Sequence, residues 1–209
     1  MKLTQTISLT ESYTVSYYLS ENNFVNNIII FLIKNYTFAT TKTKKQTIME
    51  VNFLAILAAT FTTLVVGFIW YNPKVFGTIW MRESGMTEEK AKGANMFKIF
   101  GLTILFSFFI AFTMQFLVIH QFGPMGMIGG DPTVAKPSYE AFMTDYGDAY
   151  RTFKHGALHG FMAGLFLALP VLGVNSLYER RSWKYILING GYWIVSFTLM
   201  GGIICAWRA

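Results

Sequence analysis

Charged residues and cysteines are scarce in this sequence of 209 residues. Asp, Glu, Lys and Arg together make up 13%, about half of the roughly 25% that is usual in soluble globular domains. The single cysteine, Cys205, excludes an intrachain disulfide and any CxxC metal or redox motif. We expect Cys205 to be a small packing residue. Apolar residues, by contrast, account for 53% of the chain, so the composition argues against a soluble domain.

Four long windows contain no charged residue at all. They cover residues 51–73, 99–130, 155–178 and 185–207. Each holds an apolar stretch of about 20 residues, the length that a helix needs to cross about 30 Å of hydrocarbon. We therefore predict an all-α fold, an integral membrane bundle of four transmembrane helices over about 51–71, 99–122, 155–178 and 185–207.

The first 48 residues differ from the rest in composition. They are rich in Thr, Ser, Asn and Tyr, and their one oily run, residues 28–33, is too short to span a membrane. Glu11 and Glu21 precede this run and no small-residue cleavage site follows it, so it is not a signal peptide. We predict that residues 1–48 are a disordered extension, or upstream sequence before a natural start at Met49, and that residues 49–209 form the transmembrane domain.

The basic residues predict an orientation in the membrane. Residues 72–98 and 179–184 together hold eight of them, whereas the loop before residue 155 and the C-terminus hold four: Lys136, Arg151, Lys154 and Arg208. Cytoplasmic loops carry the excess of Lys and Arg. We expect loops 72–98 and 179–184 to be cytoplasmic, in the cytoplasmic membrane if the protein is bacterial. Lys42, Lys44 and Lys45 narrow this difference if residues 1–48 are translated.

Small residues recur every four positions in the third window. Gly156, Gly160 and Gly164 are followed at the same spacing by Ala168. On a helix this spacing makes a flat strip that a neighbouring backbone can approach closely. We predict that the strip packs helices together, within the bundle or between protomers. Pro170 removes a backbone hydrogen bond and predicts a kink in the same helix.

Three histidines are expected at one face of the membrane. His155 and His159 stand one turn apart at the head of the third helix, and His120 closes the second. Imidazole suits Zn, Cu and Fe, and two histidines four residues apart can bind one ion. The pattern lacks HExxH and a nearby carboxylate, however, so we expect interfacial histidines and no cofactor. A metal- or haem-binding redox protein that uses these residues is an alternative hypothesis.

Polar side chains inside the windows suggest a second alternative. Gln115, Asn175 and Asn189 could line a path in a small transporter or channel subunit, although such amides more often bond helices to one another. The windows hold no Asp, Glu, Lys or Arg, the usual mark of ion and proton routes. A further cluster of basic residues follows the third window and predicts an interfacial anchor or an anionic-lipid headgroup site; it contains Arg180, Arg181 and Lys184.

Three stretches of the sequence resemble the domain of unknown function 1761 family. They are "WYNPKVFG..W" at 70–80, "HG...G" followed by "ALP" at 159–170, and "ERRSWK...IN.GYW" at 179–193. The resemblance covers about residues 49–207. It implies a small bacterial multi-pass membrane protein of about four helices, and it supplies no activity, cofactor or catalytic residue. The extension before Met49 departs from the family pattern.

Together these patterns predict a non-enzymatic integral membrane protein without catalytic residues. We expect it to pack through the glycine strip and to associate with itself as a homo-oligomer. Its expected partner is the lipid bilayer. The net charge of +6 does not indicate nucleic-acid binding, because the basic residues fall in short connections between apolar windows, where they anchor membrane helices.

Overall fold

The computed structural model describes residues 4–9, 13–18 and 51–208, which belong to two separate units, 1–46 and 47–209. In the first unit, β1 (Thr4–Leu9) pairs antiparallel with β2 (Tyr13–Tyr18), with Thr4 opposite Tyr18. The rest of residues 1–48 lies outside the described residues. The expectation of a disordered or upstream extension therefore stays a prediction.

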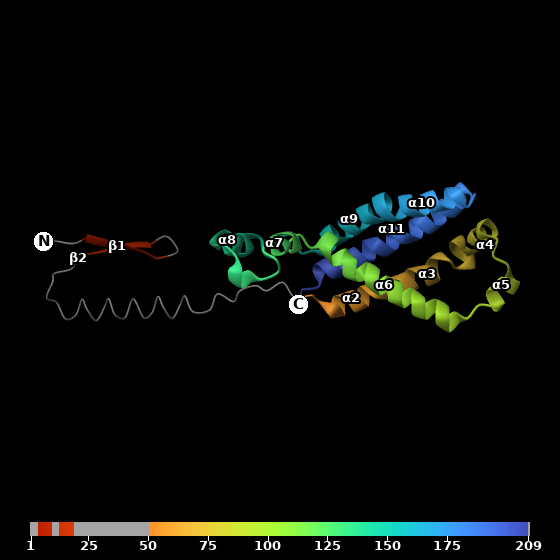
Figure 1. Cartoon of the computed structure of the whole chain (residues 1–209), viewed down its shortest axis with the longest axis horizontal. Helices are drawn as coiled ribbons and strands as arrows, with labels where there is room; N and C mark the ends of the chain where they lie inside the picture. The colour runs from red at the N-terminus through yellow and green to blue at the C-terminus, as the bar shows by residue number, and fades with distance from the viewer. Residues whose placement is uncertain (1–3, 10–12, 19–50, 209) are drawn as a thin grey trace. The chain divides into compact units, whose positions relative to one another are not determined.

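Four helical spans in the second unit are long and apolar enough to cross a membrane, which confirms the predicted fold (Figure 1). The first combines α2 (Phe53–Thr60) with α3 (Thr62–Trp70), and the second is α6 (Met96–Val118). The third combines α9 (Phe153–Ala163), the π-helical segment η3 (Gly164–Ala168) and α10 (Leu169–Tyr178), and the fourth is α11 (Trp183–Ala206).

Capping side chains explain why α6 and α11 start earlier than their charge-free windows. The side chain of Asn95 accepts a hydrogen bond from the backbone N–H of Lys98, and Ser182 accepts one from Tyr185. Such caps satisfy N–H groups that have no partner inside the helix. Each helix therefore begins at its cap and includes a lysine in its first turn, outside the apolar window.

The core of the second unit lies where α2, α6 and α11 meet. Its fully buried side chains include Ile56 and Ala59 from α2, Met114 from α6, and Met200 and Ile204 from α11. Many large apolar side chains point away from this core. Phe97 is 95% exposed and Phe68 82% exposed. Contact of such side chains with lipid hydrocarbon costs no free energy, whereas their exposure to water is unfavourable.

Two longer connections between the spans lie at the two ends of the bundle. One connection contains the π-helical η1 (Pro73–Gly77), α4 (Thr78–Ser84) and α5 (Glu88–Lys92). The other contains α7 (Phe122–Met127), the 3₁₀ turn η2 (Pro132–Val134) and α8 (Pro137–Tyr146), and it extends beyond the end of α6 (Figure 1).

A π-helical segment precedes Pro170, whereas the predicted kink stays a prediction. Proline lacks a backbone N–H, so the helix cannot keep its ordinary ladder on the preceding turn. In η3 the N–H of Leu169 bonds to the carbonyl of Gly164, five residues earlier. The wider turn accommodates the proline ring while the helix continues as α10.

Candidate functional site

The glycine strip packs against α11 within the same chain. A Cβ at Gly160 would lie 2.7 Å from the carbonyl carbon of Phe197, and one at Gly164 would lie 2.6 Å from the Cα of Ile194. A Cβ at Gly156 would meet the backbone of Gly201. Because α11 covers the strip, these glycines offer no free surface to a second copy. Self-association stays a prediction that needs another surface. Ala168 lies further along, packed against the core.

The three histidines converge at the end of the bundle where α6 finishes and α9 begins. Each offers one ring nitrogen to a group whose members all lie within 4.8 Å of one another. The Nε2 atoms of His155 and His120 are 2.8 Å apart, so one of these rings donates a hydrogen bond and the other accepts it. His120 is exposed, whereas His155 and His159 are half-buried. The cluster can therefore be reached from outside the bundle.

Local contacts hold this histidine cluster in position. Thr152 caps α9 by accepting a hydrogen bond from the N–H of His155, which fixes the first turn of the helix. The thiol of Cys205 lies 3.3 Å from the carbonyl oxygens of both Val118 and Tyr150. The end of α11 thus joins the segments that carry His120 and His155.

Two side chains that the sequence analysis missed complete this end of the molecule. Arg151 donates hydrogen bonds to the carbonyls of Cys205 and Trp207, at 2.9 and 3.2 Å. The ring of Tyr150 stacks on that of His155 with centroids 5.0 Å apart. Nothing in the spacing of the sequence marks either residue, because both contacts depend on how the loop folds back over the bundle.

The geometry of the histidine cluster suits a bare metal ion better than haem. The ring centroids of the three imidazoles lie 4.5 to 4.9 Å apart. Two axial histidines of a haem iron have the macrocycle between them, and these rings are too close to admit it. Three imidazole nitrogens on one ion leave a fourth position open, the arrangement of His₃ zinc sites.

The three intramembrane amides do not meet. Gln115 is buried near Val118, whose carbonyl contacts Cys205 on α11. Asn189 lies 16 residues before Cys205 on the same helix, so about 20 Å separates it from Gln115 along the bundle. Asn175 lines a groove of about 450 Å³ that is bordered by α10 and α11, and neither Gln115 nor Asn189 lines this groove. The transport hypothesis stays a prediction that these three residues do not support together.

Asn189 instead anchors the first connection to α11. Its side-chain oxygen accepts hydrogen bonds from the Tyr71 hydroxyl at 2.9 Å and from the Trp80 indole at 3.2 Å, and its amide donates to the carbonyl of Tyr185. The Tyr71 hydroxyl is the hydrogen-bond donor in its contact with Asn189.

The basic turn after α10 is partly occupied by contacts within the chain. Arg181 donates to the carbonyl of Ser84 at 3.0 Å and pairs with Glu179 at 3.3 Å. Ser182 donates to Glu83 at 2.6 Å, and this bond lowers the pKa of the Glu83 carboxyl. The two connections predicted on one side of the membrane thus touch at one end of the bundle. A headgroup site at Arg180, Arg181 and Lys184 stays a prediction.

Comparison with known proteins identifies the family of this chain. The comparisons with curated proteins and with solved structures found no match. A family model described as "Protein of unknown function (DUF1761)" matches residues 54–205, which include all four membrane-spanning segments except Phe53 and Ala206. The chain therefore belongs to the DUF1761 family and is a multi-pass membrane protein.

Proposed function

We propose that this membrane protein binds one Zn²⁺ ion through the imidazoles of His120, His155 and His159. The observation that carries the proposal is the convergence of three ring nitrogens, one from the turn after α6 and two from α9, within 4.8 Å of one another. Imidazole is a preferred ligand of Zn²⁺, and Zn–N bonds of about 2.0–2.1 Å place the nitrogens of a tetrahedral site about 3.3 Å apart. Small side-chain rotations would bring the three rings to that spacing.

The alternative is a group of histidines bonded only to one another, and metal titration separates the two. The protein would be purified without a histidine tag, stripped with a chelator and titrated with Zn²⁺ by calorimetry. We expect one ion per chain, and release on acidification, because protonated imidazoles do not bind metal. His155→Ala and His159→Ala should each weaken binding by about tenfold or more.

Met127→Ala is the matched control, because Met127 lies at the same end of the bundle, at the end of α7, and is 88% exposed. Its Zn²⁺ binding should equal that of the unchanged protein. A substoichiometric response, or equal binding by His155→Ala and the unchanged protein, would contradict the proposal. Co²⁺ in place of Zn²⁺ adds an absorption spectrum that reports the coordination number directly.

We also propose that the zinc site faces the non-cytoplasmic side. The excess of basic residues in 72–98 and 179–184 supports this orientation. The test introduces single cysteines at two exposed positions, Met127→Cys and Glu89→Cys, in a Cys205→Ala background. An impermeant maleimide added to intact cells should label the cysteine at 127 and not the one at 89. The reverse pattern would overturn the orientation.

A further inference from the structure

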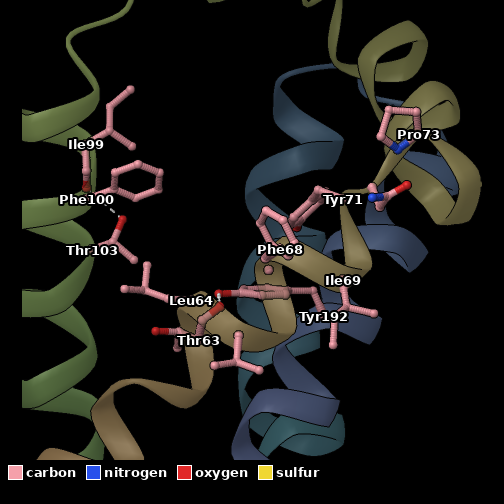
Figure 2. A pocket seen from close by; sticks show the side chains of 13 residues that line it. Thr63, Leu64, Phe68, Ile69, Tyr71, Pro73, Ile99, Phe100, Thr103 and Tyr192 are labelled. Atoms are coloured by element: carbon pink, nitrogen blue, oxygen red, sulfur yellow. Dashed lines mark hydrogen bonds between the residues drawn. The ribbon is translucent and has the colours of Figure 1, made fainter.

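A lateral groove opens between α3 and α6, at the opposite end of the bundle from the histidines. It has a volume of about 1060 Å³. Leu64, Phe68 and Tyr192 face it from one side, and Phe100 and Thr103 face it from α6 (Figure 2). Both helices are membrane-spanning segments, so the groove opens into hydrocarbon.

Three hydroxyl groups on the walls of this groove already have partners. The Tyr192 hydroxyl donates to the carbonyl of Thr63 at 3.1 Å, and the Thr103 hydroxyl donates to the carbonyl of Ile99 at 2.8 Å (Figure 2). The Tyr71 hydroxyl donates to Asn189. A polar solute would lose its hydration here without gaining these donors. The groove therefore suits a hydrocarbon chain.

Two lysines flank the end of the groove that lies toward the first connection. Pro73 and Ile99 line the groove, and Lys74 and Lys98 are their neighbours in the sequence. Both lysines are exposed. Among residues 51–208, neither belongs to an ion pair: the pairs there join Arg82 to Glu83, Lys92 to Glu88, Arg181 to Glu179 and Arg208 to Asp148.

We propose that this groove binds an acyl chain of one anionic phospholipid, whose phosphate lies between Lys74 and Lys98. The apolar walls supply the site for the chain. The two lysines supply the charge complementarity, since basic residues next to a membrane span attract anionic headgroups. The proposal is independent of the zinc site, which uses other residues at the other end of the bundle.

Native mass spectrometry of the detergent-solubilised protein tests this proposal. Added dioleoyl phosphatidylglycerol should bind as one molecule per chain, more tightly than dioleoyl phosphatidylcholine. Lys74→Gln and Lys98→Gln should each reduce binding of phosphatidylglycerol by about fivefold and leave phosphatidylcholine unaffected. Neither change touches the core, so a folding defect cannot produce the result.

Thr103→Trp fills the groove, and Thr113→Trp is its matched control. Both threonines lie on α6, Thr103 half-buried and Thr113 exposed, and each donates to the carbonyl four residues earlier, at 2.8 and 2.9 Å, but only Thr103 lines the groove. We expect Thr103→Trp to abolish lipid retention and Thr113→Trp to preserve it. Equal retention by the two variants, or equal affinity for the two lipids, would overturn the proposal.

Discussion

Replacing Gly160 by alanine is the sharpest test of how the bundle is held together. The added Cβ would meet the carbonyl oxygen of Phe197 and lie 3.1 Å from the Cα of Thr198. Both are backbone atoms of α11, which cannot rotate away as a side chain would. Overpacking costs about 1–3 kcal/mol, and rigid backbone favours the upper value. Alanine returns about 1 kcal/mol of helix propensity, so we expect a net loss of about 2 kcal/mol.

Gly101→Ala is the matched control for this substitution. Gly101 lies within α6, and a Cβ there would meet nothing within 4 Å. Only the propensity effect remains, so Gly101→Ala should stabilise the protein by about 0.5–1 kcal/mol. Unfolding by SDS in mixed micelles, followed by circular dichroism, measures both variants. If Gly160→Ala proves as stable as Gly101→Ala, the close contact between α9 and α11 does not exist as described.

Three further predictions concern the ends of the bundle. Asn189→Leu removes the acceptor of two hydrogen bonds and should cost about 1–3 kcal/mol in the same SDS assay, whereas Asn175→Leu, at an exposed position, should change stability by less than about 0.5 kcal/mol. Arg151→Ala removes the hydrogen bonds to the carbonyls of Cys205 and Trp207. Because solvent screens these partly exposed bonds, we expect amide hydrogen exchange in the last turn of α11 to become faster by only about fivefold. Arg208→Ala should leave this exchange rate unchanged. The pKa of Glu83 is lowered in the folded protein, so its carboxylate stabilises the contact between the two connections above the ordinary glutamate range. This stabilisation is lost as the pH falls through the lowered pKa, and the two connections should then move apart. Distances between spin labels on the two connections should show this movement, and Glu83→Gln should remove its pH dependence.

The spans were predictable because the membrane imposes one simple requirement. A helix that crosses hydrocarbon needs about 20 apolar residues and no exposed charge, and charge-free windows record that requirement directly. Their ends were less predictable. The window from residue 99 predicted the start of α6 three residues late, because a lysine can occupy the first turn of a helix whose cap is Asn95.

The contacts of the connections were not predictable, because they join residues far apart in the sequence. Trp70 donates to the carbonyl of Ile188, and Trp80 to Asn189, yet both tryptophans look like ordinary interfacial aromatics in the sequence. Asn189 was a candidate for lining a transport path, because its hydrogen-bond partners, Tyr71 and Trp80, are also far from it in the sequence. A side chain's hydrogen-bonding capacity is visible in a sequence, but the identity of its partner depends on the packing of the helices.

Hydrogen bonds to other parts of the bundle explain several polar residues, but they do not explain the three histidines. Asn189 and Arg151 each bond to backbone or side-chain groups that need a partner. Among residues 51–208, the one side-chain hydrogen bond of the cluster joins His155 to His120, and His159 adds a third ring beside them. Three imidazoles packed together satisfy no buried backbone group and would repel one another if protonated. Packing alone therefore gives no reason for three histidines at this point, whereas a shared metal ion does.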